Sequence, residues 1–325
     1  MTVYVLRRLA QTALVLAVTS LLVFAGLYLI GDPVEILVNP AADQIEKDRA
    51  SKALGLDKPI HEQYLGFIGG AFTGNLGNSF VYARPALEVI FERMPATLEL
   101  AFLAMVIAIV LGIPLGLYAG LRPHSAGAKT IMAGSILGFS LPTFWVGLLL
   151  IMLFAVQLGW LPSTGRGPTT DVLGLQLSIF NVEGLRYALL PAINLALFKL
   201  SLIIRLTRAQ VREQSLLDYI KFARAKGLTN QRVIGVHLLK NIMIPLITVI
   251  GLELGSVIAF AVVTETIFAW PGMGKLVIDS IFQLDRPVVV AYLLVVVFMF
   301  ITINLIVDLL YSALDPRVRL ADIQQ

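Results

Sequence analysis

The stretch 97–121 reads TLELAFLAMVIAIVLGIPLGLYAGL, and Glu99 is its only charged residue. A helix of about 20 mainly apolar residues crosses a bilayer core of about 30 Å, so this stretch predicts a membrane-spanning helix. The whole chain agrees with this, because 14% of its 325 residues are charged, against about 25% in an ordinary soluble domain. The mean hydropathy is +0.85. These values exclude a soluble globular protein and a disordered chain.

Five further apolar blocks have a similar length, which predicts an all-α polytopic membrane protein with six transmembrane helices. The other five helices are expected at about residues 9–30, 131–156, 187–206, 246–268 and 288–311. Pro142 lies inside the third helix of the six, and membrane helices tolerate proline better than soluble ones do. The apolar run 172–180 is too short to cross and is expected at the membrane interface or in a re-entrant turn.

The distribution of Lys and Arg predicts the orientation, because cytoplasmic loops are rich in these residues. Basic residues far outnumber acidic ones in segment 205–240, whereas acidic residues outnumber basic ones in segment 31–96. Both termini are therefore expected in the cytoplasm, with a large outer loop between the first and second helices. The expected segments are 1–30 with the first helix, an extracytoplasmic subdomain 31–96, a five-helix core 97–311 that includes a cytoplasmic loop 207–241, and a cytoplasmic tail 312–325.

The cytoplasmic loop has the pattern of a short basic helix at residues 216–226. Ser215 and Asp218 have the S-x-x-D spacing of a capping box at its start. Gly227 follows Lys226 and suits a left-handed helix end. Two functions remain open for this helix. It either lies on anionic lipid through its basic side chains, or it docks on a cytoplasmic partner.

Several charged residues fall within the predicted spans, where ionisable groups are costly and suggest function. Glu99 and Glu265 lie near outer ends, where solvation or pairing with a residue such as Arg93 is one explanation. Glu253 is deeper in its span, and Lys199 is a possible partner for it. A place on a translocation path is the functional alternative for these groups.

Enzyme signatures are missing from the sequence. The chain has no cysteine and three histidines that lie far apart, so neither a thiolate nor a histidine-rich metal site is expected. It contains no G-x-x-x-x-G-K-[ST] phosphate loop, H-E-x-x-H or G-x-S-x-G motif. No catalytic residue, metal site or cofactor is therefore expected in this chain. The basic balance is assigned to membrane topology, and nucleic acid is not expected as a partner.

Residues 221–227, KFARAKG, resemble a variant of the "EAA" loop in permease subunits of ATP-binding-cassette importers. Segment 218–245 is more similar to the peptide and nickel branch, whose pattern is D-Y-x-x-x-A-R-A-K-G followed by H-x-L-(R/K)-N-x-x-x-P. Lys221 and Phe222 depart from the general E-A-A form. Further motifs of that branch occur in order at residues 31–33, 54–59, 112–116, 160–162, 265–274 and 315–317.

The resemblance implies a type I importer permease in the cytoplasmic (inner) membrane, which works by alternating access on peptides. Nickel chelates or glutathione-like peptides are alternative substrates, and an ion-coupled secondary transporter is the rival function. The implied partners are a second homologous permease, two ATPase subunits that bind ATP and Mg²⁺, an extracytoplasmic substrate-binding protein and membrane lipid.

The resemblance also implies site residues. The ATPase-docking residues that it implies are Asp218, Tyr219, Lys221, Ala223, Arg224, Ala225, Lys226, Gly227, His237 and Asn241. The candidates for the translocation path are Glu253, Lys199 and Glu265.

Overall fold

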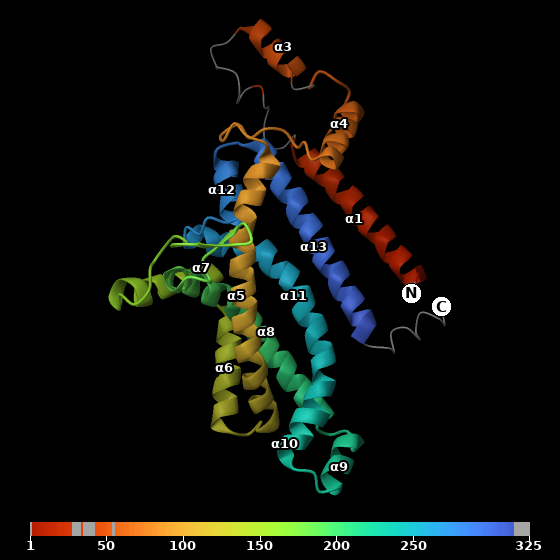
Figure 1. Cartoon of the computed structure of the whole chain (residues 1–325), viewed down its shortest axis with the longest axis vertical. Helices are drawn as coiled ribbons and strands as arrows, with labels where there is room; N and C mark the ends of the chain where they lie inside the picture. Colours follow the sequence, from red (N-terminus) through yellow and green to blue (C-terminus); the bar gives the residue numbers. More distant parts are fainter. Residues whose placement is uncertain (1, 28–33, 35–42, 54–55, 315–325) are drawn as a thin grey trace. The chain divides into compact units, whose positions relative to one another are not determined.

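The computed structural model describes residues 2–27, 34, 43–53 and 56–314, without the side chains of 2–9, 27, 50, 53 and 308–314. Its contacts divide the chain into two units. The first joins Met1–Ala96 with Pro271–Ile301, and the second joins Thr97–Trp270 with Thr302–Gln325. Figure 1 shows that nearly every element is a helix.

Within the described residues, four helices are long and apolar enough to cross a bilayer. They are α5 (Ala86–Leu121), α8 (Val182–Gln214), the continuous helix Asn230–Ile267 and the apolar part of α13 (Arg286–Leu314). The continuous helix consists of α10 (Asn230–Arg232), the π-helix η2 (Val233–Leu238) and α11 (Leu239–Ile267). The prediction of an all-α polytopic membrane protein is confirmed.

Residues 9–27 of the first predicted span lie in helix α1 (Thr2–Leu27), in which Ala10–Gly26 is the apolar part whose side chains are described; residues 28–30 of that span lie outside the described residues. The exact number of six spans stays a prediction. The tail 312–325 lies almost wholly outside the described residues, and the predicted segment boundaries are likewise untested.

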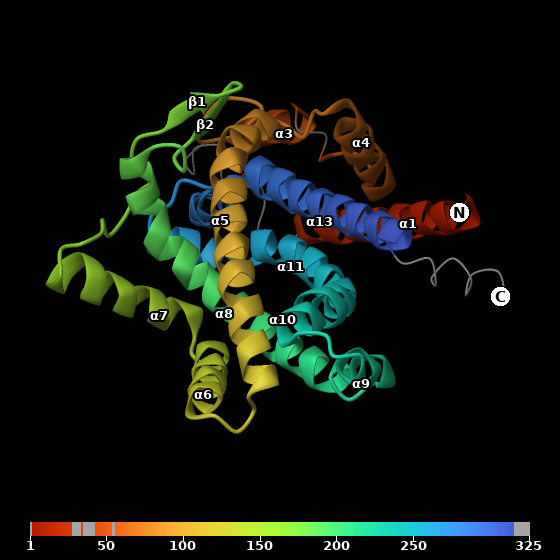
Figure 2. The same cartoon turned by 60° about the horizontal axis from the view of Figure 1, so that its bottom comes forward.

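The third span is broken, so the prediction of one helix over 131–156 is wrong. Helix α6 (Ala126–Ser140) is followed by α7 (Thr143–Leu150) and the π-helix η1 (Ile151–Gln157). The two halves are bent by 108°, as Figure 1 and Figure 2 show. The cause is Pro142, which disfavours helical backbone at the preceding residue and lacks an N–H to donate. Leu141 is accordingly extended, with φ −82° and ψ 135°.

The apolar run 172–180 is not helical. Strands β1 (Thr170–Val172) and β2 (Leu175–Leu177) pair antiparallel, with Val172 opposite Leu175. The turn between them places Leu173 at φ 55° and Gly174 at φ 81°, and Asp171 Oδ1 accepts a hydrogen bond of 3.0 Å from Gly174 N. Such a turn twists in the sense that two strands require, which is why this short run forms a hairpin.

Helix α8 packs closely against α5 along three glycines of α5. A Cβ added to Gly112, Gly116 or Gly120 would come within 2.7 Å of a side chain on α8. The α8 residues at these contacts are Ile203, Thr207 and Val211. Small residues at this spacing let two membrane helices approach until their backbones almost touch.

The first unit contains α3 (Gln44–Ala53), α4 (Ile60–Thr73) and α12 (Met273–Phe282) besides α1. Helix α4 packs on α1, where Ser20 Oγ and Tyr64 OH are 2.9 Å apart. The buried carboxylate of Asp285 accepts hydrogen bonds from Ser79 Oγ and from Phe80 N, the latter at 3.1 Å. This carboxylate therefore holds segment 79–81 against the turn that precedes α13.

Candidate functional site: the basic helix and the buried charges

The basic helix of the loop is α9, which spans Asp218–Ala225 and is shorter than predicted. Its N-cap is Leu217, which makes no side-chain capping bond. The predicted capping box is wrong, because the Ser215 hydroxyl instead donates a hydrogen bond of 2.6 Å to the Val211 carbonyl at the end of α8. The predicted helix end is confirmed, since Gly227 has φ 74°, a conformation that glycine adopts without steric cost.

One face of α9 is covered by its own chain. Ile220 and Ala223 are 1% and 4% exposed and belong to a core cluster with residues of α8, η2 and α11. The predicted docking residue Ala223 therefore faces its own chain, and it does not lie on the outer surface of the helix.

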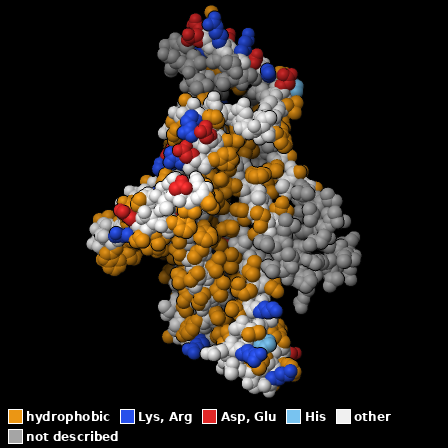
Figure 3. Space-filling view, in the orientation of Figure 1, with side chains coloured by type: hydrophobic (Ala, Val, Ile, Leu, Met, Phe, Trp, Pro, Cys, Tyr) orange, Lys and Arg blue, Asp and Glu red, His pale blue; other side chains and the backbone are white. Residues whose placement is uncertain are grey.

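The opposite face of α9 is open and combines apolar with basic side chains. Leu216 and Phe222 are 73% and 61% exposed, and Lys226 Nζ lies 4.6 Å from the centroid of the Phe222 ring. Figure 3 shows Lys and Arg side chains gathered over this end of the second unit. We define the exposed face of α9 to include exposed residues at both ends of the helix, and its members are Leu216, Leu217, Lys221, Phe222, Arg224, Ala225 and Lys226.

Asp218 begins α9 and supports the helix electrostatically. Lys221 Nζ donates a hydrogen bond of 2.9 Å to Asp218 Oδ1, and this bond together with the charge of Lys221 lowers the pKa of the Asp218 carboxyl. A carboxylate in the first turn also interacts favourably with the helix dipole. Asp218 is fully exposed to solvent, so its effect is confined to the local order of α9.

Three further predicted docking residues, one within α9 and two that follow it in the chain, make contacts within the chain. Tyr219 OH donates a hydrogen bond of 2.8 Å to Gln214 Oε1 at the end of α8. Asn241 Nδ2 donates one of 2.7 Å to the carbonyl of His237 in η2. These bonds hold the segments on either side of α9, and His237 itself is half-buried.

The structure pairs Lys199 of α8 with Glu253 of α11. Lys199 Nζ donates to Glu253 Oε2 and also to Ser256 Oγ, the latter at 2.6 Å. Ser256 Oγ in turn lies 2.8 Å from Glu253 Oε2. The side chains of Lys199 and Glu253 are 7% and 23% exposed, so the carboxylate is the more accessible partner.

Glu265 lies apart from that pair, because twelve residues of α11 separate it from Glu253, or about 18 Å along a helix. Its side chain is fully buried, and Thr97 Oγ1 donates a hydrogen bond of 2.6 Å to its Oε1. Interfacial solvation of Glu265 is therefore a wrong prediction. The structure brings two of the three pathway candidates together and places the third elsewhere.

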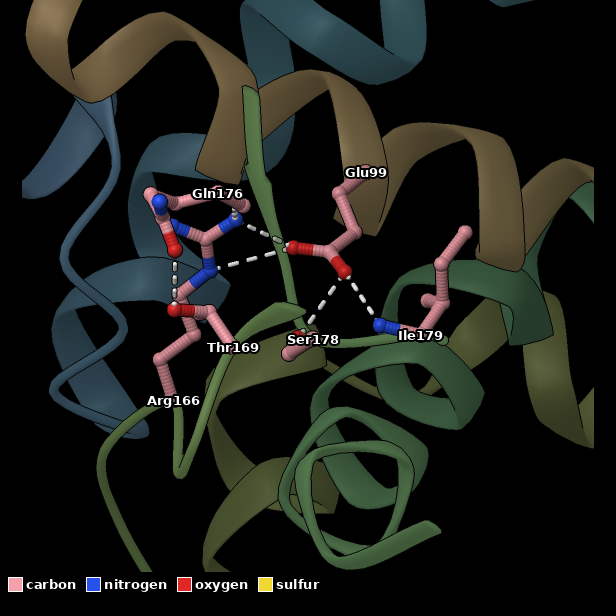
Figure 4. A network of polar contacts seen from close by, with 6 residues as sticks. All are labelled: Glu99, Arg166, Thr169, Gln176, Ser178 and Ile179. Atoms are coloured by element: carbon pink, nitrogen blue, oxygen red, sulfur yellow. Dashed lines mark hydrogen bonds and ion pairs between the residues drawn. The ribbon is translucent and has the colours of Figure 1, made fainter. Parts of the chain in front are cut away.

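Glu99 is the centre of a polar network at the other end of the second unit (Figure 4). Its Oε2 accepts hydrogen bonds from Arg166 Nε at 3.0 Å and Arg166 Nη2 at 2.6 Å. Its Oε1 accepts from Ser178 Oγ at 2.9 Å and Ile179 N at 2.6 Å. The suggested pairing with Arg93 is wrong. All four bonds instead tie α5 to the segment that carries the β1–β2 hairpin.

Sequence reasoning missed Arg166 and Ser178, although one signal was present. An acidic residue in an apolar span requires a partner, and Arg166 is one of the basic residues of the outer segments. The sequence separation of 67 residues gave no means of choosing it. Within the described residues, no three His, Cys, Asp or Glu side chains are grouped as metal ligands would be.

Comparison with known proteins matches nearly the whole chain to one family of transport proteins, in agreement with the resemblance found in the sequence. Residues 112–320 match the family described as "Binding-protein-dependent transport system inner membrane component", and residues 1–101 match its N-terminal companion. The chain is 40% identical over 330 residues to the di/tripeptide transport system permease protein DppB of Pseudomonas aeruginosa, covering 97% of this chain and 98% of that protein. It is 40% identical over 333 residues to the dipeptide transport system permease protein DppB of Escherichia coli K12, with the same coverage.

A Bacillus subtilis protein, the oligopeptide transport system permease protein AppB, is 36% identical over 320 residues, which cover 98% of this chain and 99% of that protein. Among solved structures, the fold is similar to one chain of the MetNI methionine ABC transporter in inward facing conformations. That match has a TM-score of 0.52 and 17% identity, and it covers 70% of this chain and 96% of the other. The chain belongs to the family of binding-protein-dependent transport system inner membrane components, and it is an inner-membrane protein.

Proposed function

We propose that this chain is a permease subunit of an ATP-driven importer that takes up short peptides. The observation that supports this best is the 40% identity to two DppB permeases over 97% of the chain. Such similarity includes the spans, the outer hairpin and the basic helix together. Nickel chelates and glutathione-like peptides are less favoured substrates, because the relatives that span the chain are named for dipeptides and oligopeptides.

The exposed face of α9 is the proposed contact with a cytoplasmic ATPase subunit. Its apolar residues, Leu216, Leu217 and Phe222, fit a groove on a protein, and Lys221, Arg224 and Lys226 surround them. A helix that only rested on lipid would place its apolar side chains in the acyl region and its cations at the headgroups. In α9 the apolar and basic side chains share one exposed face, with Lys226 over the Phe222 ring, which favours a protein groove.

In this proposal the chain carries no ATPase site of its own. Two ATPase subunits bind ATP and Mg²⁺, and a second homologous permease completes the membrane pathway. An extracytoplasmic binding protein delivers the peptide. Lys199 and Glu253 are proposed to line the pathway. Glu265 is fully buried, so we assign it a positioning role between α11 and Thr97.

The test is uptake of a labelled dipeptide by vesicles that contain the whole complex and its binding protein. We expect uptake that requires ATP and stops when the ATPase subunits carry an inactivating substitution. Collapse of ion gradients by an ionophore is the control. Uptake that continues without active ATPase and stops with the ionophore would establish the ion-coupled alternative instead.

A further inference from the structure

The break in the third span leaves irregular backbone exposed. Helix α6 ends at Ser140, and α7 begins at Thr143 after Pro142, which supplies no side-chain cap. Residues 140–145 are all exposed in the isolated chain. Non-helical backbone at membrane depth is tolerated only where other protein covers it or where it lines a water-filled space. The break is therefore covered by other protein or lines a water-filled space, and lipid is excluded.

A contact between two aromatic rings indicates how deep in the membrane this break lies. Phe139, one residue before the end of α6, stacks on Phe198 of α8 with ring centroids 4.7 Å apart. Phe198 lies near the middle of the 33 residues of α8, and a helix of that length measures about 50 Å. The hydrocarbon core is about 30 Å thick. The break therefore lies near the middle of the membrane, far from either surface.

The ion pair of Lys199 and Glu253 lies at the same depth. Lys199 follows Phe198 in the chain, and its Nζ is 5.3 Å from the centroid of the Phe198 ring. Of the Glu253 carboxylate, Oε2 accepts from both Lys199 Nζ and Ser256 Oγ. Among the described residues no hydrogen bond reaches Oε1, and 23% of the Glu253 side chain is exposed. This arrangement leaves one carboxylate oxygen able to accept from a ligand.

We propose that the α6–α7 break, the Phe139–Phe198 stack and the Lys199–Glu253 pair form one wall of a peptide-binding station in the middle of the membrane. Glu253 Oε1 accepts a hydrogen bond from a main-chain N–H or the terminal ammonium of the peptide. Phe139 is 44% exposed and offers its remaining aromatic surface to apolar side chains, beside the Arg205 guanidinium whose carbon lies 4.3 Å from the ring centroid. The Lys199–Glu253 pair is neutral as a whole, and the Arg205 guanidinium over Phe139 adds a positive charge to this wall. This inference rests on the proposed function for the nature of the ligand.

Accessibility of Ser140 tests the station directly, because the chain has no cysteine of its own. Ser140→Cys in the assembled transporter is expected to react with a hydrophilic, membrane-impermeant thiol reagent during ATP turnover. An imported dipeptide is expected to slow that reaction several-fold. The matched control is Val110→Cys, a 60% exposed apolar position of α5, which is expected to stay unlabelled.

Three results distinguish the possibilities. Protection of Ser140→Cys by the dipeptide supports the station. No labelling at any stage of turnover overturns it, because lipid or a partner subunit then covers the break. Labelling that the dipeptide leaves unchanged overturns the binding of peptide there. Uptake by the wild-type complex is measured in parallel, so a failure of the proposed function is recognised separately.

An exchange of the charges of Lys199 and Glu253 distinguishes a role in peptide binding from a purely structural role. The double variant Lys199→Glu/Glu253→Lys keeps an ion pair but removes the acceptor oxygen from the exposed position. We expect it to assemble with its partners at the wild-type level and to lose at least ten-fold in uptake. Wild-type uptake in this variant would mean that the pair only holds α8 to α11.

Discussion

Glu99 on α5 and Arg166 before the β1–β2 hairpin form an ion pair in which both Arg166 Nε and Nη2 donate to Glu99 Oε2, at 3.0 and 2.6 Å. The Glu99 side chain is fully buried and that of Arg166 is 13% exposed. Since Ser178 and Ile179 saturate the other oxygen, the carboxylate positions the hairpin relative to α5.

Removal of one member of this pair is expected to be costly. Glu99→Ala leaves the Arg166 guanidinium without its partner, and breaking a buried pair in this way typically costs about 3–5 kcal/mol. We expect a lower thermal unfolding temperature in detergent and faster protease cleavage within residues 166–180. The control is Thr169→Val, which removes only an exposed hydrogen bond to Gln176. Equal protease resistance in Glu99→Ala and the wild type would contradict this role for Glu99.

The glycine contacts between α5 and α8 give a second prediction. A Cβ on Gly116 would lie 2.6 Å from Thr207 Cβ and 2.7 Å from the Ile204 carbonyl oxygen. Gly116→Val is therefore expected to separate the helices and to destabilise the protein by about 1–3 kcal/mol, as overpacking generally does. Thermal unfolding of the purified protein measures the effect.

Gly134 of α6 is the matched control for that substitution. No atom lies within 4 Å of a Cβ built at Gly134, so Gly134→Ala is expected to leave the unfolding temperature unchanged or slightly raised. If both variants unfold at the wild-type temperature, α5 and α8 do not approach as closely as described.

The orientation is a third prediction, because it depends on the charge distribution alone. Asn75 precedes α5, and Asn230 begins the helix that follows α9; both are exposed. In intact cells, a cysteine at Asn75 is expected to react with an impermeant thiol reagent. One at Asn230 is expected to react only after the membrane is opened. The opposite pattern would reverse the predicted topology.

The sequence predicted the class of fold because the length and composition of each apolar block indicate a membrane span, whatever the other blocks do. It did not predict the break at Pro142, since a proline in a span is equally compatible with a mild kink. It placed Lys199 and Glu253 as possible partners on grounds of charge. Whether Glu99 pairs with Arg93 or Arg166 depends on tertiary contacts, and single-sequence patterns carry no information about those.

The lack of information about tertiary contacts also explains why the sequence did not predict that Ala223 is buried. The pattern of residues 221–227 predicted a helix end at Gly227, because a left-handed cap is a local property of the backbone. Which face of that helix is exposed depends on packing with η2, which begins ten residues after Ala223. Its neighbour Phe222, which is 61% exposed, is instead one of the apolar residues exposed for a partner.

The most direct test of the account is therefore co-purification of the ATPase subunits with Phe222→Ser, together with substrate-stimulated ATP hydrolysis. Phe222 is 61% exposed, so the substitution is expected to leave the unfolding temperature of the isolated chain unchanged. It is expected to abolish both ATPase binding and stimulated hydrolysis. The comparison variant Lys221→Gln/Arg224→Gln/Lys226→Gln is expected to weaken them only partly. Wild-type ATPase binding in Phe222→Ser, with failure of complex assembly in the triple variant alone, would contradict docking through this face and favour a lipid anchor.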